Sequence, residues 1–379
     1  MNVLLFTSVP LAPPWDQGDK NLAYQLTRAL GQVRFNVLTT RVDHLNQQAN
    51  LNPWPIFEHK LPNVLGKGLV YLRLVKWLRG LPEGERPDIV HYIYRPYPFS
   101  SSMLRLVPAV NQIPGIHTLP ASNDGKPIQK QLFITRYVVS ISRFGFKQLK
   151  LAGVEHASHI PPGINLQDWQ VDGCQRRAAK LKLGLEGATT VLFPGHYGPG
   201  MGADTIVAAL PEMTARIPNL RLIFACRIRS RADHSREQAL RSKLAAQQLN
   251  DCVIHFQTVA DMQTIVSASD LVLLPLENMR NKLDIPTTLV ECMAAGIPLV
   301  ISDLAPMNEL LYAEDGSATG VGLAVKPGDP GALAMAVAQL LGDEALRLES
   351  GRRGALLAAE MFDIRNTAKK YETLYQEIR

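Results

Sequence analysis

The stretch that most constrains the fold is IVSASDLVLLPLENMRNKLDIPTTLVECMAAGIPLVISD, residues 265–303. Its apolar run at 271–276 is typical of a buried parallel strand. A polar loop follows, and then a helix that opens at Pro286-Thr287-Thr288 and stops at Gly296, before a second apolar strand at 298–301. Strand, loop, helix and strand form a right-handed crossover whose loop lies at the carboxyl ends of the strands. We therefore expect an open parallel sheet with a ligand site at that edge.

The helix of this crossover has the features of an anion site. The free amides at its start and the positive end of its dipole attract phosphate groups. Glu291 lies one turn further in, where its carboxylate can accept hydrogen bonds from sugar hydroxyls. A phosphate site beside a hydroxyl-binding carboxylate suits a nucleotide-sugar.

Apolar strands alternate with helical patterns along the whole chain, which predicts an α/β protein with two doubly wound domains. We expect a Rossmann-like acceptor-side domain at 1–165 and a second Rossmann-like donor domain at 166–363, facing each other across a cleft. The strands are expected at 3–7, 35–39, 89–92, 115–118 and 137–141, and then at 190–193, 221–225, 253–256, 271–275, 298–301 and 322–325.

Several of these segments resemble retaining GT-B glycosyltransferases of the family four type. The motifs ASDLVLLP, PTTLVECMAAGIPLV and VKPGDPGALAMAV are similar to the family's donor-binding core, and LAPPWDQGDKNLAYQLTRAL resembles its first strand-to-helix loop. PDIVHYIY, VVSISRFGFKQLKLAGV and IPPGINLQDW follow in family order. The resemblance implies the GT-B fold, with a terminal helix at 364–379 that crosses back onto the first domain.

The resemblance also implies roles for individual residues. Glu291 would bind the nucleotide ribose, while Thr287 and Thr288 would offer groups to the diphosphate; simple capping by threonine is the alternative. In the first domain, Gly18 would bring its amide to the diphosphate or the acceptor, and His117 would contact the donor sugar. A turn glycine and a structural histidine remain the competing interpretations. His91 is a weaker candidate of the same kind.

The chain departs from the family pattern at positions that carry charge. Leu283 stands where a second glutamate usually holds the transferred sugar, so the neighbouring Asp284 is the candidate to replace it. Lys282 adds a cation that could face the diphosphate, and solvated loop charges are the alternative for both residues. His196 and Met201 stand where arginine and lysine usually neutralise the diphosphate, in a loop where Gly200 allows close backbone approach. The missing charge is expected from Arg227 and Arg229, unless these are plain surface arginines.

Charge and composition limit the partners. Residues 1–165 hold 18 Lys and Arg against 9 Asp and Glu, whereas the remainder holds 22 against 25. The basic first half suggests an anionic or lipid-linked acceptor, and residues 67–81 read either as a membrane-surface helix or as a core helix with solvated basic residues. Nucleic acid is not expected, because no recognition motif or basic stripe occurs.

No apolar run is long enough to span a membrane. The direct start on a strand favours a cytoplasmic location, where the four cysteines stay as thiols.

These observations predict a glycosyltransferase that moves a sugar from a nucleotide diphosphate donor, UDP-linked by expectation, to an acceptor hydroxyl. The resemblance implies retention of configuration. The sequence holds no convincing pair of metal-binding acids and no motif for a resident cofactor, so neither is expected. An inactive homologue that serves as a binding or partner subunit, and an epimerase or phosphorylase of similar fold, remain as alternatives.

Overall fold

The computed structural model describes residues 1–7, 9–13, 17–40, 48–57, 64–123, 125–228, 230–256 and 261–379. The chain divides into two compact units. Unit 1 comprises Met1–Ile164, Asn281–Asp284 and Phe362–Arg379, and unit 2 comprises Asn165–Arg280 and Ile285–Met361. The boundary after residue 164 lies one residue from the expected one. The expected boundaries differ from the structure at 281–284 and at 362–363, which the sequence analysis assigned to the donor domain and which belong to unit 1.

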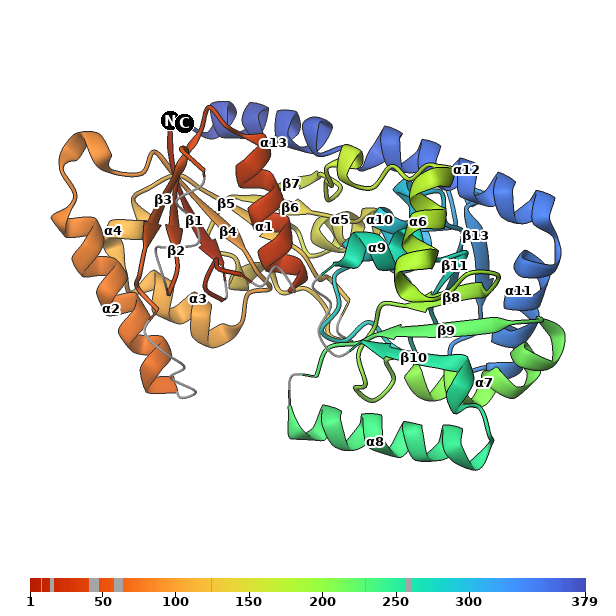
Figure 1. Ribbon diagram of the computed structural model, residues 1–379. Helices are drawn as coiled ribbons and strands as arrows, with labels where there is room; N and C mark the ends of the chain where they lie inside the picture. Colours follow the sequence, from red (N-terminus) through yellow and green to blue (C-terminus); the bar gives the residue numbers. More distant parts are fainter. Residues whose placement is uncertain are drawn as a thin grey trace. The chain divides into compact units, whose positions relative to one another are not determined.

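Unit 1 is built on a seven-stranded parallel sheet in the order β3-β2-β1-β4-β5-β6-β7 (Figure 1). Its strands are β1 (Asn2–Thr7), β2 (Arg34–Leu38), β3 (Leu51–Trp54), β4 (Ile89–Ile93), β5 (Gly115–Leu119), β6 (Tyr137–Ser140) and β7 (His156–His159). Its helices are α1 (Gly18–Ala29), α2 (Val64–Gly80), α3 (Pro98–Arg105), α4 (Pro108–Asn111), α5 (Arg143–Leu151) and α13 (Ile364–Ile378), with 3-10 turns η1 (Glu83–Glu85) and η2 (Lys130–Leu132).

The sequence analysis missed β3 and β7, which are the two edge strands of this sheet. The sequence of β3 is LNPW, and proline is tolerated in a sheet only at an edge because it has no N–H to donate. The sequence of β7 is HASH, which lacks the apolar run of a central strand. Edge strands bury less of their surface, and so they carry weaker hydrophobic signals.

Both faces of the unit 1 sheet are covered, which is why its central strands are mostly apolar. Successive side chains of β1 point to opposite faces. Val3 and Leu5 pack with α1 and α13, whereas Leu4 and Phe6 pack with α2, α3 and α4. The terminal helix α13 is therefore part of the first unit's core.

Buried polar contacts also hold α13 on the sheet. His91 of β4 contacts the Tyr375 hydroxyl through Nδ1 at 2.6 Å and the Thr118 hydroxyl through Nε2 at 2.7 Å. The Thr118 hydroxyl lies 2.9 Å from the hydroxyl of Tyr371. His91 is fully buried, and burial lowers its pKa to about 3, so the ring stays neutral. Its role is structural, and the functional interpretation of His91 is corrected.

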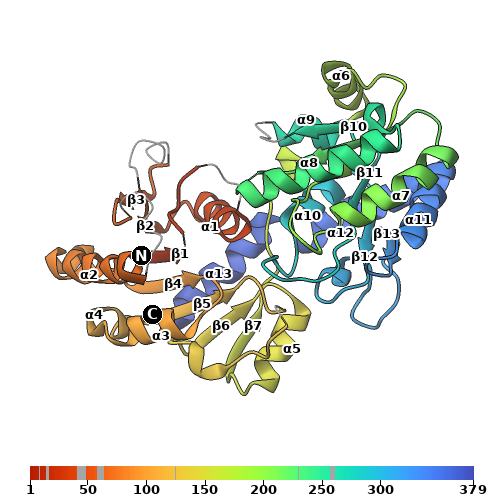
Figure 2. The same cartoon turned by 90° about the horizontal axis from the view of Figure 1, so that it is seen from below.

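Unit 2 is built on a six-stranded parallel sheet in the order β10-β9-β8-β11-β12-β13. Figure 2 labels β10, β11, β12 and β13 of this sheet. Its strands are β8 (Thr189–Phe193), β9 (Leu220–Ala225), β10 (Val253–Phe256), β11 (Leu271–Leu274), β12 (Leu299–Ser302) and β13 (Gly322–Val325). Its helices are α6 (Gly173–Leu183), α7 (Ala203–Arg216), α8 (Arg231–Ala246), α9 (Met262–Ser267), α10 (Thr287–Ala294), α11 (Pro330–Gly342) and α12 (Glu344–Met361), with 3-10 turns η3 (Leu166–Asp168), η4 (Asn250–Cys252) and η5 (Met307–Leu310).

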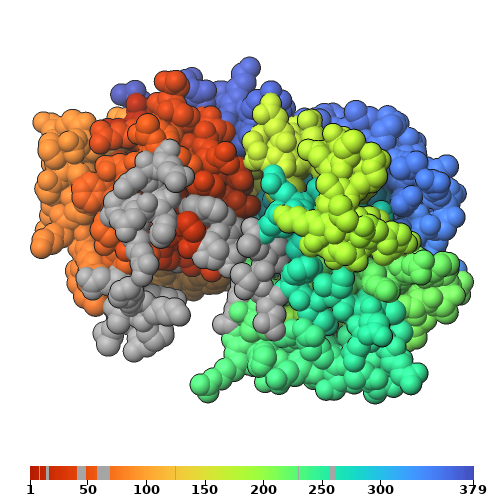
Figure 3. Space-filling model, viewed as in Figure 1, coloured from red at the N-terminus to blue at the C-terminus, as the bar shows by residue number. Residues whose placement is uncertain are grey.

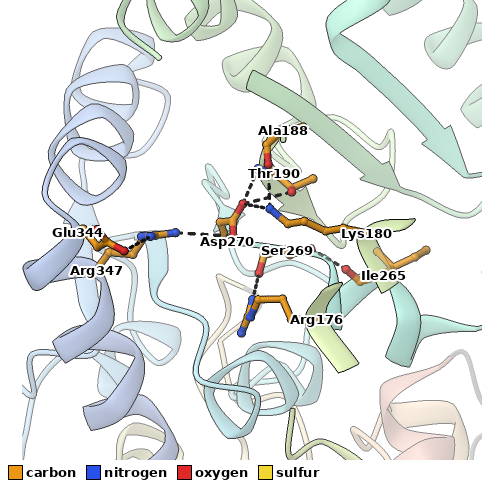
Figure 4. Close-up of polar contacts among 9 residues, drawn as sticks. All are labelled: Arg176, Lys180, Ala188, Thr190, Ile265, Ser269, Asp270, Glu344 and Arg347. Carbon is orange, nitrogen blue, oxygen red and sulfur yellow. Dashed lines mark hydrogen bonds and ion pairs between the residues drawn. The ribbon is translucent and has the colours of Figure 1, made fainter. Parts of the chain in front are cut away.

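An ion cluster fixes two helices to the amino-terminal edge of this sheet (Figure 4). Asp270, just before β11, lies 2.7 Å from Lys180 of α6 and 3.6 Å from Arg347 of α12. It also accepts hydrogen bonds from the amide and hydroxyl of Thr190. Thr190 and Asp270 lie at the beginnings of β8 and β11, so the cluster is a structural device on the edge opposite to the expected ligand site.

No helix in the described part of the chain combines the length and hydropathy needed to cross a membrane.

Candidate functional site

The strand order of unit 2 places a topological switch point between β8 and β11. Chains leave these neighbouring strands toward opposite sides, and ligands of open α/β sheets bind outside the carboxyl ends of strands at such a point. The loop after β8 holds the glycine-rich segment 194–202, which we call the glycine-rich loop. It contacts the loop after β11 directly, because the Glu277 amide donates to the Gly200 carbonyl at 2.9 Å.

Close packing explains one glycine of this loop. Gly202 has φ +94°, a conformation that side chains rarely adopt, and a Cβ there would lie 2.8 Å from the Pro275 carbonyl oxygen. It is also the N-cap of α7. The glycine therefore brings the start of α7 against the carboxyl end of β11.

Two helix starts lie at this edge of the sheet without side-chain caps. The N-cap residues of α7 and α10 are Gly202 and Pro286, and neither supplies a side-chain hydrogen bond to the first turn. Thr287 and Thr288 lie inside the first turn of α10, so plain threonine capping does not explain them. Helix starts of this kind bind anions through their amides and dipole.

Glu291 lies in the second half of α10 and is 6% exposed. Among the described residues, no hydrogen bond or ion pair reaches its carboxylate. Burial raises its pKa to about 8. A largely buried carboxylate without partners is costly, and such groups are often ligand-binding residues.

The positions where charge was expected at this edge hold side chains of different chemical types. His196 is half-buried, and its Nδ1 accepts a hydrogen bond from the Gly198 amide at 3.2 Å. Met201 is buried as an apolar side chain. Arg227 is half-buried two residues after β9, at the same edge of the sheet. Arg229 lies outside the described residues. Unit 2 thus contains six of the expected site residues, on elements that follow the carboxyl ends of its strands: His196, Gly200, Arg227, Thr287, Thr288 and Glu291.

His117 takes a different place from the one expected. It lies in β5 of unit 1 and is 1% exposed, with Nε2 donating to the Tyr94 carbonyl at 2.7 Å. Its ring stacks on Tyr92 and meets Phe133 edge-on. Burial lowers its pKa to about 4. The expected histidine in contact with a sugar is therefore corrected to a core histidine, because aromatic rings enclose it.

Asp284 is likewise an internal anchor. It is 1% exposed, and its carboxylate accepts hydrogen bonds from the Ser122 amide at 2.6 Å, the Ser122 hydroxyl at 2.6 Å and the Ser142 hydroxyl at 2.5 Å. Its own amide donates to the Pro120 carbonyl. These bonds, all within unit 1, replace the expected sugar contact. Lys282 lies half-buried in the same short segment.

The neighbouring Leu283 explains Gly18. A Cβ on Gly18, the first residue of α1, would lie 2.4 Å from the Leu283 Cδ1 atom. Leu283 also packs against the core that α1 shares with β1. The lack of a side chain at Gly18 thus makes room for Leu283, and the expected approach of the Gly18 amide to the diphosphate or the acceptor stays a prediction.

Sequence reasoning missed two features of the unit 2 site. Glu277 holds Gly200 through its amide, and its carboxylate lies 3.4 Å from the Thr205 hydroxyl. Tyr197, in the middle of the glycine-rich loop, is 1% exposed and points inward. Its aromatic character within a glycine-rich loop was the signal available. Among the described residues, no group of three or more His, Cys, Asp or Glu side chains could hold a metal ion.

Comparison with known proteins identifies relatives of the unit 2 segment. Residues 188–343 match the family model described as glycosyl transferases group 1. The chain is 27% identical over 206 residues to an alpha-D-kanosaminyltransferase of Streptomyces kanamyceticus, covering 54% of this chain and 50% of that protein. It is 28% identical over 292 residues to a phosphatidyl-myo-inositol mannosyltransferase of Mycolicibacterium smegmatis, covering 73% and 66%. The chain thus spans from half to two thirds of the length of these curated relatives.

The whole fold is shared with a solved structure. HepE of Anabaena in complex with UDP has a TM-score of 0.78 to this chain, at 15% identity, and each chain is covered over 100% of its length. At this identity the likeness shows the fold alone. Both Rossmann-like units of the chain are matched.

Proposed function

From a chain that has the GT-B fold and carries a glycosyl transferases group 1 domain at 188–343, we propose a retaining glycosyltransferase that uses a nucleotide diphosphate sugar. The proposed donor is UDP-linked, because the similar HepE structure was solved with UDP. The acceptor is a hydroxyl group. Two of the relatives are named as glycosyltransferases, an alpha-D-kanosaminyltransferase and a phosphatidyl-myo-inositol mannosyltransferase, which supports the reaction class and leaves the acceptor open.

The buried carboxylate of Glu291 is the observation that carries this proposal. A nucleotide ribose presents two neighbouring hydroxyl groups, which can donate to the two oxygens of one carboxylate. Such a ligand would supply the hydrogen bonds that the described residues do not give Glu291. The helix start at Thr287 and Thr288 lies one turn before it, where the diphosphate of the same ligand would bind.

The leaving diphosphate gains negative charge as the sugar departs, and the site must stabilise that charge. The amides at the starts of α7 and α10 and the guanidinium of Arg227 would do so in unit 2. Lys282 would contribute its ammonium group. In the proposed step the bond from sugar C1 to phosphate oxygen breaks, a bond from C1 to the acceptor oxygen forms on the same face, and the acceptor proton passes to the departing phosphate. Asp284 is not the nucleophile, because three donors already occupy its carboxylate.

The proposal includes no metal ion, because protein cations and amides would neutralise the diphosphate. It also includes no resident cofactor. We place the reaction in the cytoplasm, where nucleotide sugars would be available.

An anionic or lipid-linked acceptor is part of the same proposal. Helix α2 exposes Leu69 and Leu72 together with Lys76 and Arg79, a combination that suits the surface of an anionic bilayer. Its other face packs into the unit 1 core. Vesicles that contain phosphatidylglycerol should sediment the protein, and Leu69→Ser with Leu72→Ser should abolish this. Equal sedimentation of both proteins would contradict the membrane contact.

An inactive homologue is the second candidate. The observation in its favour is that Met201 and Leu283 are both apolar and packed where the resembled family carries charge. Such a protein would bind the nucleotide and show neither transfer nor slow hydrolysis of the donor. A screen of nucleotide sugars with release of UDP as the readout separates the two functions.

The test of the nucleotide site is a cycle of one protein change and one ligand change. Calorimetry would measure the binding affinities for UDP and 2′,3′-dideoxy-UDP. The proteins compared are the native protein, Glu291→Gln and the exposed control Glu360→Gln. We expect Glu291→Gln to weaken UDP by about 2 kcal/mol, the cost of charge-assisted hydrogen bonds, and to remove the preference for UDP over its dideoxy form. The Glu360→Gln control should keep the native affinity for UDP and the native preference for UDP over its dideoxy form. A dideoxy penalty that persists in Glu291→Gln would remove the assignment.

A further inference from the structure

Tyr197 lies in the middle of the glycine-rich loop, yet its side chain is buried in the body of unit 2. Its ring stacks on Phe224 of β9, with centroids 6.0 Å apart and planes inclined by 5°. Its hydroxyl lies 2.9 Å from Nδ1 of His255 in β10. One side chain thus connects the loop that follows β8 to two neighbouring strands of the sheet.

His255 is itself held in place. Its ring stacks on Phe224, with centroids 5.2 Å apart. Glu237, a buried carboxylate of α8, acts on His255 electrostatically and receives two hydrogen bonds from the Arg241 guanidinium, at 3.1 and 2.8 Å. Tyr197, Phe224 and His255 therefore form a stack with a fixed hydrogen bond, next to a locked ion pair.

The protonation states define the direction of this hydrogen bond. Burial raises the pKa of the Tyr197 hydroxyl well above its usual 10, so the hydroxyl keeps its proton. Burial, assisted by the positive charge of Arg241, lowers the pKa of His255 to about 4, so the ring is neutral at pH 7. Among the described residues, Nδ1 is the acceptor that this hydroxyl contacts. Tyr197 accordingly donates to Nδ1, and the histidine carries its own proton on Nε2.

The contacts of Tyr197 hold the glycine-rich loop, whose backbone amides must stabilise an anion without the cations that the resembled family has in this loop. The loop has His196 and Met201 where the resembled family has cations, and Met201 is buried. Backbone amides stabilise an anion only when they are already oriented toward it, because reorienting them would cost the energy that they supply. The loop contains four glycines, so without an anchor its backbone would be free to adopt many conformations.

We propose that Tyr197 and His255 are positioning residues that hold the amides of the glycine-rich loop in the orientation that binds a diphosphate. This inference rests on the proposed function, of which it specifies the anion-binding part. Neither residue touches the ligand. Their hydrogen bond and the stack on Phe224 fix the loop from the inside of the sheet.

The structure also offers an approach for chemical rescue. A cavity of about 340 Å³ lies beside His255, with Arg241, Ser242 and Asn250 in its wall. The residues of α8 that line it are exposed, and α8 runs along the surface of unit 2 (Figure 3). A small molecule such as imidazole can enter from solvent when the histidine ring is removed.

The experiment compares inorganic pyrophosphate, which probes the amides alone, with uridine, which probes the nucleoside part. Tyr197→Phe keeps the ring stack and loses only the hydroxyl. We expect Tyr197→Phe to lower the affinity for pyrophosphate about fivefold or more, which is the scale of one hydrogen bond, while the affinity for uridine stays the same. The control Tyr24→Phe, on α1 of unit 1, should change neither. A residue with a purely structural role would lower the melting temperature without separating the two ligands.

His255 provides the second arm. His255→Ala should lower the affinity for pyrophosphate as Tyr197→Phe does, and imidazole in the buffer should restore that affinity. His255→Asn places an amide oxygen near the position of Nδ1 and should retain most of the affinity, which also covers the case in which the alanine variant does not fold. The inference is overturned if Tyr197→Phe binds pyrophosphate normally, if both ligands weaken together, or if the native protein binds no pyrophosphate. Pyrophosphate binding without any nucleotide binding would instead contradict the proposed function.

Discussion

Replacing Glu291 by glutamine should make the stability of this protein much less dependent on pH. The carboxylate is 6% exposed and receives no hydrogen bond from the described residues, and burial raises its pKa from 4.5 to about 8. The folded state therefore binds this proton more tightly than the unfolded state does. Stability falls as pH rises from the unfolded value toward the folded one, and the loss is complete above pH 8. Glutamine has the same shape and no proton to lose.

The two pKa values give the magnitude. Below pH 4.5 the group is protonated in both states and costs nothing. The difference between the two pKa values lowers the free energy of unfolding by about 1 kcal/mol at pH 5 and by about 5 kcal/mol at pH 9, because each unit of pKa difference corresponds to about 1.4 kcal/mol. Between these two pH values, the native protein should lose about 4 kcal/mol relative to Glu291→Gln. This loss is a large part of the stability of an ordinary domain.

Urea unfolding at pH 5, 7 and 9 would measure the effect, with the native protein, Glu291→Gln and Glu360→Gln side by side. Glu360 is an exposed carboxylate of α12, so its replacement controls for the loss of one charge in unit 2. We expect the difference in unfolding free energy between the native protein and Glu291→Gln to grow steadily with pH, and the Glu360→Gln difference to stay flat. A Glu291→Gln difference that is the same at pH 5 and pH 9 would refute the reasoning. UDP should reduce the native protein's loss at high pH, since ribose hydroxyls stabilise the ionised carboxylate.

The remaining predictions concern unit 1 and the charges of the site. Gly18→Ala should lower the melting temperature by a few degrees, and Leu283→Ala should relieve that effect; additive losses in the double variant would contradict the packing. Asp284→Ala should lower the free energy of unfolding by about 3 kcal/mol, measured in urea, because three donors lose their acceptor. An unchanged urea midpoint would count against the role of Asp284 as an internal anchor. Lys282→Ala or Arg227→Ala should slow turnover roughly 100-fold with a smaller change in donor binding, and normal turnover in both would show that neither neutralises the diphosphate. Transfer activity should survive EDTA, whereas loss that magnesium or manganese restores would contradict a metal-independent reaction.

Much of the fold follows from sequence because parallel strands that are buried on both sides must be apolar along their length. The central strands β1, β4, β8 and β11 were predicted within two residues of their observed ends, and the crossover into α10 was read directly from its apolar runs. Glu291 was singled out on the same local evidence. Its burial and its lack of partners among the described residues could not be known, because they depend on the layers packed around α10.

The tertiary structure decided which polar residues contact a ligand and which serve the core. His117 and Asp284 have the residue types of a catalytic site, yet aromatic rings enclose the first and three donors occupy the second. Tyr197 lacks an obvious functional signature, yet its contact with His255 joins a loop and a strand separated by 58 residues. Local sequence determines which segments form strands and helices, because periodicity and apolar content act within a few turns. The side chains that meet inside the fold are brought together from distant segments, so only the assembled sheets could assign their roles.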